Sequence, residues 1–458
     1  MEMVTRGKHE RGAILIHVAF ALLALIAFSA FVVDMGMMWV SRGQAQNAAD
    51  AGALAGAVSL MKDNAVPTEA TKSAFQWANN NVIFGQASST TNVRVTFSGA
   101  AAGTCGTSCD VLTTLPPCAP NKPGCVRVDI FRNAPDRPYR GGATLGNPIP
   151  TLFGPMIGIT EQRVRATATA QVSNGNQIKC ILPFAIIDRW ADNYDPTPVT
   201  TYFPNDAAPG TAGWTPNDYF QPTDSPADVY IPPYDGNTNH TGWKVTADYG
   251  RQLILKDGST GNYSSGWSQM VCLEGANCSG DDVRDWLTAC SPQPIGIATA
   301  ANACTAVDMP HGCIDVKTGV AQGPVTQGVN NAVGTDSSAV WSPTADGPGG
   351  PGKGAVTGGQ GMSSPRIRGM VVLDINHYDA SGCTGSTCVG KVANIIGFFL
   401  EGMCNDVKAA GQLDYGLDCD DPNKDVVGRI VTLPAQYVSG TGEVEDDASF
   451  AKVVRLVR

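Results

Sequence analysis

The chain lacks concentrated positive charge. Its 458 residues include 31 Lys and Arg against 41 Asp and Glu, and no basic cluster follows the first few residues. A nucleic-acid binder needs a positive stripe to displace the counterions of the phosphates. The sequence therefore predicts no nucleic-acid partner.

The chain also lacks the common catalytic motifs. Neither G-x-S-x-G nor H-E-x-x-H occurs. Gly347–Lys353 reads G-x-x-x-x-G-K, but Gly354 stands where a phosphate-binding loop has the Ser or Thr that holds Mg²⁺. His311 lies two residues from Cys313, which allows a nucleophile pair, although Cys313 in an oxidising compartment is more often half of a disulfide. We expect no enzyme activity, no catalytic residue, no cofactor and no small-molecule substrate.

A run of carboxylates near the C-terminus is a candidate Ca²⁺ site. It consists of Asp414, Asp418, Asp420, Asp421 and Asp425. The run lacks the spacing and the central Gly of a twelve-residue calcium loop. A solvated acidic turn around Cys419 is the simpler interpretation, and Ca²⁺ binding stays an open alternative.

All fourteen cysteines lie between Cys105 and Cys419, which suits an oxidising compartment. Zinc is the alternative, but no C-x-x-C pair occurs and the five His do not fall at ligand spacing beside these cysteines. We therefore expect disulfides, whose connectivity the sequence leaves open. The disulfide candidates are Cys105, Cys109, Cys118, Cys125, Cys272, Cys278, Cys304, Cys313, Cys383, Cys388, Cys404 and Cys419.

The segment from Ala13 to Val33 is a 21-residue apolar run. As a helix it spans about 31 Å, the thickness of a bilayer's hydrocarbon core. Arg6, Lys8 and Arg11 precede the run, which predicts a cytoplasmic N-terminus of residues 1–12 and an exported C-terminal bulk. A cleaved signal peptide is the alternative, but its apolar region would be shorter and closely followed by an A-x-A-like site.

The helix is expected to continue beyond the membrane. No Pro occurs from Met35 to Leu60, and Ala is abundant there. Small residues recur three and four positions apart at Ala45, Ala48, Ala49, Gly52, Ala53 and Gly56. This stripe predicts a face that another helix approaches closely.

Three features in order carry a family resemblance: Arg11-Gly12 before the apolar run, Val33-Asp34-Met35-Gly36 after it, and then Q-A-Q-N-A-A-D-A-G-A-L-A-G-A at residues 44–57. Residues 11–57 thus resemble the N-terminal domain of the TadG-like proteins of Flp (Tad) pilus assembly. The resemblance implies a single-pass protein of the bacterial inner membrane, periplasmic in its bulk, whose partners are other Tad proteins. His17 stands five residues after Gly12, where processed pseudopilins carry Glu, so processing of the anchor stays open. Longer members carry a von Willebrand A domain, and the D-x-S-x-S of its metal site is absent here; the nearest approach is Val371–Tyr378.

The exported part is expected to contain two regions. A helix over Thr68–Asn80 and period-two alternation at 93–97, 126–130 and 164–170 predict a pilin-like α+β region at 34–175, in which the long helix packs on an antiparallel sheet. Short β-type runs at 370–373, 395–400, 426–433 and 453–457 predict a β-rich, disulfide-stapled domain at 178–458. Within it, the Pro- and Asp-dense 192–240 is expected as loop or insertion rather than core, and the Gly/Pro-rich 341–362 as a linker or exposed loop.

Two functions fit these features. The first is a membrane-anchored structural or assembly protein of a Flp pilus system, in which the anchor and small-residue helix dock to other Tad components. The second is a membrane-anchored extracytoplasmic adhesin or ligand-binding module that uses the loops at 192–240 or 341–362.

Overall fold

The computed structural model describes residues 10–60, 67–87, 92–98, 109–112, 125–132, 148–191, 220, 222–223, 227–234, 237–257, 263, 267–275, 278–317, 322–347, 352–380, 388–414, 417–421, 423–441 and 448–457. The chain divides into two compact units. The first consists of residues 1–60, 65–172 and 454–458, and the second of residues 61–64 and 173–453.

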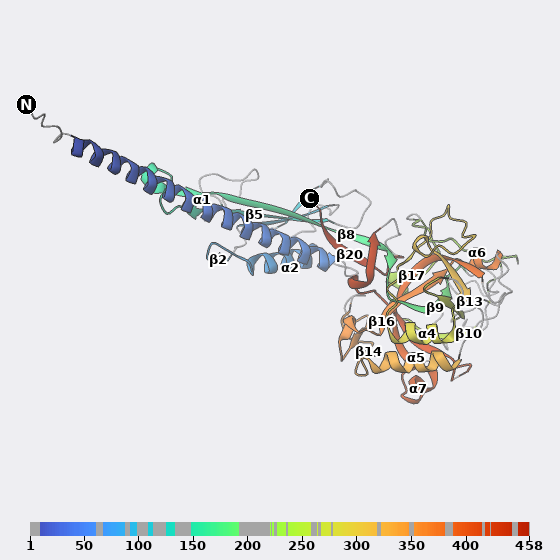
Figure 1. Ribbon diagram of the computed structural model, residues 1–458. Helices are drawn as coiled ribbons and strands as arrows, with labels where there is room; N and C mark the ends of the chain where they lie inside the picture. Colours follow the sequence, from blue (N-terminus) through green and yellow to red (C-terminus); the bar gives the residue numbers. More distant parts are fainter. Residues whose placement is uncertain are drawn as a thin grey trace, which may run out of the picture. The chain divides into compact units, whose positions relative to one another are not determined.

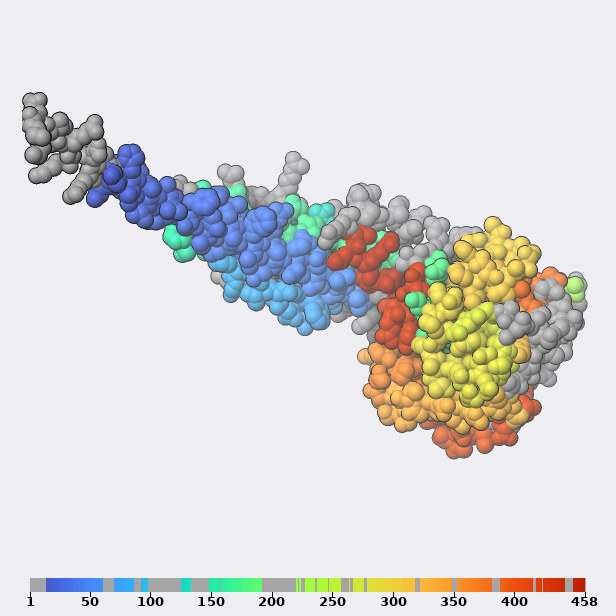
Figure 2. All heavy atoms as spheres, viewed as in Figure 1, coloured from blue at the N-terminus to red at the C-terminus, as the bar shows by residue number. Residues whose placement is uncertain are grey.

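Helix α1 (Glu10–Leu60) is continuous over 51 residues, as the absence of Pro allows (Figure 1). The large apolar side chains between Ile14 and Val33 are exposed, and Figure 2 shows these turns uncovered by the rest of the unit. By length and composition the helix is able to cross a membrane. An exposed apolar run of this kind is unfavourable in water and favourable in lipid.

The rest of the first unit is a helix and a sheet that pack along the second half of α1. Helix α2 (Pro67–Asn79) lies beside α1, and the sheet has the strand order β8-β5-β3-β4 within this unit (Figure 1). Strands β8, β5 and β3 are antiparallel neighbours, and β4 is parallel to β3. Its strands are β3 (Val93–Ser98), β4 (Cys109–Leu112), β5 (Cys125–Arg132) and β8 (Val164–Ile178). The predicted long helix on an antiparallel sheet is confirmed.

Alternation along β5 decides which face of the sheet α1 covers. Val126, Val128 and Ile130 are fully buried, while Arg127 pairs with Asp129 on the alternate positions, N to O 3.1 Å. Side chains two residues apart point to the same face of a strand. The period-two pattern of the sequence therefore gives the sheet an apolar face toward α1, where Val126 and Val128 lie against Gly56 and Gly52. Two hairpins complete the unit, β1–β2 (Val82–Ile83, Gln86–Ala87) and β6–β7 (Ile149–Pro150, Glu161–Gln162).

The second unit is built on a seven-stranded sheet of order β10-β18-β17-β13-β11-β9-β16. Additional pairings of β10 with β11 and of β16 with β17 close the sheet on itself. Most neighbours are antiparallel, whereas β9 and β16, and β10 and β11, are parallel. The strands are β9 (Ile181–Ile187), β10 (Gln252–Asp257), β11 (Trp267–Cys272), β13 (Cys313–Lys317), β16 (Ile367–Leu373), β17 (Cys388–Met403) and β18 (Val426–Val431).

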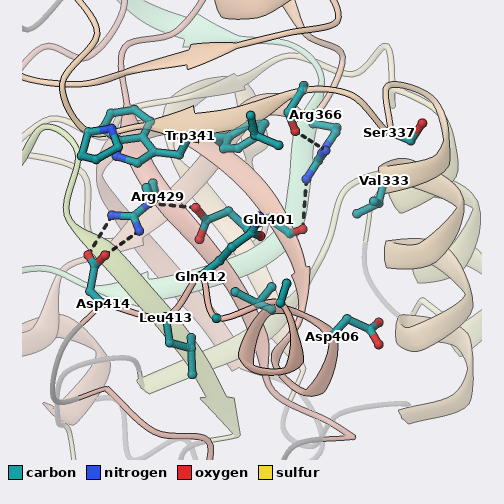
Figure 3. Close-up of a pocket in the computed structure, with 17 residues that line it drawn as sticks. Val333, Ser337, Trp341, Arg366, Glu401, Asp406, Gln412, Leu413, Asp414 and Arg429 are labelled. Carbon is teal, nitrogen blue, oxygen red and sulfur yellow. Dashed lines mark hydrogen bonds and ion pairs between the residues drawn. The ribbon is translucent and has the colours of Figure 1, made fainter.

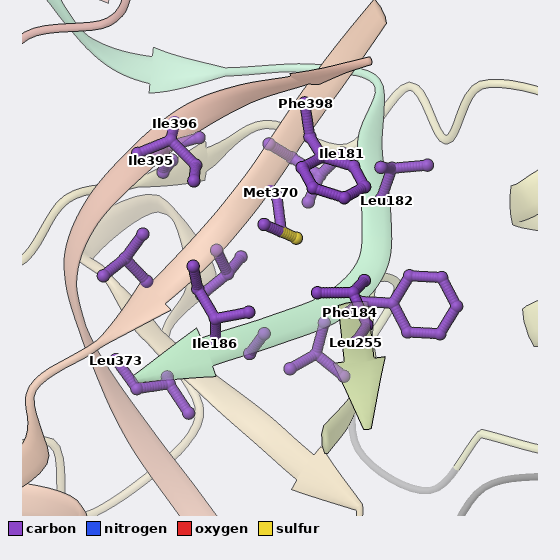
Figure 4. Packing of buried hydrophobic residues seen from close by; sticks show 14 of the residues in the cluster. Ile181, Leu182, Phe184, Ile186, Leu255, Met370, Leu373, Ile395, Ile396 and Phe398 are labelled. Atoms are coloured by element: carbon purple, nitrogen blue, oxygen red, sulfur yellow. The ribbon is translucent and has the colours of Figure 1, made fainter. Parts of the chain in front are cut away.

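Burial explains why these strands read as continuous apolar runs. All seven residues of β9 and all seven of β16 are buried. Figure 4 shows Ile181, Met370 and Phe398, which come from three different strands, meeting in the interior. Helices α4 (Gly280–Thr288) and α5 (Gln322–Gly334) pack against each other, and a Cβ on Gly328 would lie 2.6 Å from the Cβ of Leu287. Glycine at this position permits the close approach.

The remaining elements of the described chain are short. They are α3 (Val245–Asp248), α6 (Ile375–Ala380), α7 (Cys404–Ala409), the 3₁₀ turns η1 (Gly154–Ile157), η2 (Met309–His311), η3 (Gly361–Ser363) and η4 (Ala435–Tyr437), and the strands β12 (Ile295–Gly296), β14 (Val340–Ser342), β15 (Ala355–Thr357), β19 (Val438–Thr441) and β20 (Lys452–Val457).

Two segments differ from the predicted loops. Within 192–240, Phe220, Tyr230 and Tyr234 are buried, so the described part of this segment contributes to the core instead of lying outside it. Tyrosine hydroxyls find polar partners inside, which lets a polar-looking segment become buried. Within 341–362, β14 and β15 pair as a hairpin, which excludes the linker alternative, while the exposed-loop alternative stays a prediction for the connection between the two strands. The remaining residues of 192–240 and residues 348–351 lie outside the described chain.

Candidate functional site

The small side chains of α1 pack inside the first unit. A Cβ on Gly52 would lie 3.0 Å from the carbonyl oxygen of Ala74 in α2, and a Cβ on Gly56 would lie 2.9 Å from Cγ1 of Val126 in β5. Glycine therefore lets α1 approach both α2 and the sheet. The fully buried alanines of the two helices are Ala45, Ala48, Ala49, Ala53, Ala57, Ala70, Ala74 and Ala78.

This packing changes the interpretation of the stripe. The sequence correctly predicts a face for close helix approach, but the approaching helix is α2 of the same chain. The stripe is therefore already occupied within the chain, and docking of this helix to another Tad component stays a prediction for its other faces. Small-residue faces have the same sequence pattern whether the partner is internal or external, because both need only a short side chain at the contact.

A pocket of about 480 Å³ opens in the second unit beside the β14–β15 hairpin (Figure 3). Trp341 of β14 and Leu413, from the turn after α7, lie on different sides of it, with Arg429 of β18 and Glu401 of β17 between them. The Trp341 ring packs on Gly354, where a Cβ would collide with it. Close packing against Trp341 therefore explains why residue 354 of the Gly-rich connection is a glycine.

Arg429 is the centre of the pocket's charge network. Its Nε lies 2.8 Å from Glu401 Oε1, and its two terminal nitrogens each lie 2.7 Å from an oxygen of Asp414. The side chains of Arg429 and Glu401 are each only 7% exposed, whereas Asp414 is 48% exposed. The guanidinium carbon also lies 5.4 Å from the centroid of the Trp341 ring.

The pKa shifts of this network follow from burial and charge together. Burial raises the pKa of the Glu401 carboxyl, and the charge of Arg429 opposes that rise. Burial acts to lower the pKa of Arg429, but its bonds to Asp414 and the nearby carboxylates outweigh burial, so that pKa is raised. Gln252 of β10 also donates to Glu401 and accepts from the backbone N–H of Asp414 at 2.7 Å. The network thus joins β10, β17, β18 and the turn after α7.

Arg366 also lies in the pocket wall, where its guanidinium binds backbone carbonyl groups of the neighbouring segments. It donates to the carbonyls of Asp336, Ala339, Leu400 and Glu401 at 2.8–3.1 Å. Desolvation lowers its pKa. Both guanidinium groups of the pocket are thus engaged with internal acceptors. The geometry supports a structural role for these charges and for the Trp341 ring that packs against Arg429.

A second buried polar cluster lies where the parallel strands β9 and β16 end. Asp188 Oδ1 accepts from the backbone N–H groups of Arg189 and Trp243 at 3.0 and 2.9 Å, and Asp188 Oδ2 accepts from the Tyr230 hydroxyl at 3.0 Å. Burial raises the pKa of Asp188 to about 7, and the charge of Asp374 adds to the rise. Asp188 is not among the residues that the sequence predicts, although a carboxylate directly after an apolar strand is a signal for such a site.

Asp374 is the Asp of Val371–Tyr378, the segment whose sequence comes nearest to the D-x-S-x-S motif of a von Willebrand A metal site. Its Oδ1 accepts from the backbone N–H of His377 at 3.0 Å, and its Oδ2 accepts from the Tyr234 hydroxyl at 2.9 Å. Asp374 thus caps the start of α6. Among the described residues, no group of three or more His, Cys, Asp or Glu is placed to hold a metal ion.

The acidic run after α7 forms a turn with internal partners. Asp418 lies 2.5 Å from Lys408 Nζ, Asp420 2.9 Å from Lys256 Nζ, and Asp421 2.8 Å from Lys424 Nζ. Asp425 accepts from the backbone N–H groups of Asp420 and Asp421 at 2.8 and 3.0 Å. Together with the pairing of Asp414 to Arg429, this arrangement favours the acidic-turn interpretation. The side-chain bond from Lys408 lowers the pKa of Asp418.

Four disulfides occur in the described part of the second unit: Cys180–Cys290, Cys272–Cys278, Cys304–Cys313 and Cys404–Cys419. Cys125 and Cys388 are also disulfide-bonded. Cys105, Cys118 and Cys383, and the side chain of Cys109, lie outside the described residues. The Cys180–Cys290 pair was missed, because its sequence separation of 110 leaves no local signal.

The candidate nucleophile pair and the candidate phosphate-binding loop both have structural roles in the fold. The sulfur of Cys313 is bonded to Cys304, so it is no thiol nucleophile for His311. His311 Nδ1 instead lies 2.9 Å from Asp308 Oδ2 on the surface. Gly347 and Gly352–Gly354 lie in the connection between β14 and β15, a strand–strand context instead of the strand–helix context of a phosphate-binding loop.

Residues 12–59 match the family described as putative Flp pilus-assembly TadE/G-like. No curated protein and no solved structure matches the chain. The family match covers almost the whole of α1, so the resemblance predicted from the sequence is confirmed for this segment. The exposed apolar helix and the disulfides together indicate a membrane anchor with an extracytoplasmic bulk.

Proposed function

We propose that this chain is a membrane-anchored structural component of a Flp (Tad) pilus assembly system, acting through protein contacts rather than by catalysis. The observation that carries the proposal is the coincidence of the TadE/G-like segment, residues 12–59, with α1. One part of this helix is lipid-compatible, and the other is the packing centre of a folded unit. A rigid helix of this kind couples a membrane position to an extracytoplasmic domain.

The proposed topology is that of a bacterial inner-membrane protein. Arg6, Lys8 and Arg11 precede the apolar run, so the N-terminus is cytoplasmic and the bulk periplasmic. The disulfides support this side, because such bonds persist in the periplasm and are reduced in the cytosol. Its partners in this proposal are other Tad proteins. They would contact faces other than the small-residue stripe, which is buried within the chain.

A second function has one observation in its favour. The pocket beside Trp341 adjoins the segment 341–362, so an adhesin or ligand-binding module would have a concave site there. Against it, the charges at the pocket's centre already have internal partners.

Deletion of the gene, with complementation by the full chain, separates the two functions. Loss of Flp pili that the full chain restores is the result expected for an assembly component. Normal piliation with altered surface attachment would overturn it in favour of the adhesin. Alkaline phosphatase fused after Arg458 tests the topology: activity is expected, and an inactive fusion of full length would place the C-terminus in the cytoplasm.

A further inference from the structure

The loop between β6 and β7 presents apolar side chains to the surface. Met156 is 80% exposed, Leu152 is 63% exposed and Ile159 is 42% exposed. Single exposed apolar residues are ordinary on protein surfaces. Three large ones within eight positions, in a segment that has no charged residue from 149 to 160, are a different pattern.

Asp34 holds this loop against α1. Its Oδ1 accepts from the backbone N–H of Leu152 at 2.8 Å, and its Oδ2 accepts from the backbone N–H of Phe153 at 3.1 Å. Asp34 directly follows the apolar run that ends at Val33. Twenty residues separate Asp34 from Ile14, so the loop is fixed about 30 Å along the helix from the start of the exposed apolar turns. That distance equals the thickness of the hydrocarbon core.

If residues 14–33 span a bilayer, the loop lies at the depth where the hydrocarbon core ends. Figures 1 and 2 show the loop, in teal, beside α1 at the end of the unit from which the first turns of the helix project. Lipid is the partner that fits this geometry, because the apolar side chains of the loop extend the apolar surface of the span at its outer end.

The backbone of the loop suits an environment of low polarity. Ile159 N–H donates to the Gly154 carbonyl at 2.9 Å, Met156 N–H to Phe153 at 3.0 Å, and Thr151 N–H to Thr160 at 3.2 Å. Peptide groups that already have partners cost less to bring near lipid than unpaired ones. A Cβ on Gly154 would lie 2.8 Å from that of Thr151, so glycine is needed for this tight turn.

We infer that the β6–β7 loop inserts Leu152, Met156 and Ile159 into the interface of the outer leaflet, as a second membrane contact beside the α1 span. Asp34 is the positioning residue that holds the loop at this depth. Two contacts around one helix would restrain how far the helix slides and tilts in the bilayer, since tilt is set by interfacial anchors and by packing. This inference goes beyond the proposed pilus role and does not depend on it.

Photo-crosslinking of the full chain in phospholipid vesicles tests the inference. Benzoylphenylalanine replaces one residue at a time: Met156 in the loop, Leu23 in the span, and Val58 at the far end of α1. Leu23 and Val58 are 63% and 52% exposed, and Val58 lies about 36 Å beyond Asp34 along the helix. All three sites are therefore accessible and differ in depth.

Lipid adducts are expected at positions 156 and 23, with a yield at 156 at least about tenfold above that at 58, because interfacial segments bury their apolar face at the headgroup–acyl boundary. Asp34→Ala should lower the yield at 156 severalfold and leave the yield at 23 unchanged. A yield at 156 equal to that at 58 would overturn the inference. So would a crosslink from 156 to a second copy or to another protein in place of lipid, which would make the loop a protein contact.

Discussion

Replacing Arg429 by Met removes the guanidinium and keeps an apolar stem of similar length. Glu401, 7% exposed, would then be left as a buried carboxylate without its cation. Removing one partner of a buried ion pair costs about 3–5 kcal/mol, mostly through the stranded charge. The half-exposed Asp414 adds little, because solvent screens pairs at the surface.

This cost should appear as a loss of thermal stability of the second unit. With about 2–4 °C per kcal/mol for a domain of this size, the Arg429→Met variant should melt about 6–20 °C lower than the parent chain at pH 8. Tryptophan fluorescence is a suitable signal, because six of the eight Trp lie in the second unit. The protein is measured in detergent, as the full chain.

The pH dependence and a double variant identify the stranded charge as the cause. Burial already raises the pKa of Glu401, and without Arg429 nothing comparable opposes it. The folded variant would then hold a proton that the unfolded chain has released, so its deficit should shrink as the pH falls toward the ordinary Glu value of 4.5. Glu401→Gln in the Arg429→Met background should restore most of the stability. Asp414→Asn alone should cost about 1 kcal/mol or less. An equal loss in the double and single variants would refute this reasoning.

Two further predictions concern the first unit and the buried carboxylate. Gly56→Val should destabilise the packing of α1 by about 1–3 kcal/mol, because its Cβ would lie 2.9 Å from Val126; faster amide exchange in α2 would show this, and Gly36→Val, with open space around it, is the matched control. Asp188 has a pKa of about 7 in the fold against 3.8 ordinarily, so the folded state keeps a proton that the unfolded state loses. Stability should therefore fall as the pH rises from about 4 to about 7, and urea unfolding of Asp188→Asn should lack this slope; the same slope in the variant would point to another group.

Local patterns in the sequence predict the main secondary-structure elements of the first unit. The apolar run and the Pro-free continuation predict α1, and period-two alternation predicts β3, β5 and β8, because each element depends on neighbours a few residues away. The closed sheet of the second unit depends on pairings between strands far apart in sequence, such as β9 with β16. Nothing in the local pattern of either strand specifies its partner.

The candidate site was less predictable for the same reason. Arg429 and Glu401 come from different strands, and Asp414 from a turn, so only the fold brings their charges together. The Cys180–Cys290 pair spans 110 residues. The sequence shows Asp414 only as one member of an acidic turn, and its bonds to Arg429 depend on a strand that lies outside that turn.

The two parts of the TadE/G-like segment have different environments, and Asp34 stands at their boundary. Before Asp34 the apolar side chains are exposed and need lipid; after it the small side chains are covered by α2 and the sheet. The same stripe cannot hold a second protein without displacing α2. In the proposed pilus role, a partner would contact exposed surface outside the stripe, such as the faces where Val58 of α1 and Trp77 of α2 are 52% and 55% exposed. The family segment thus explains how the first unit is anchored and packed, and its buried stripe has that structural role.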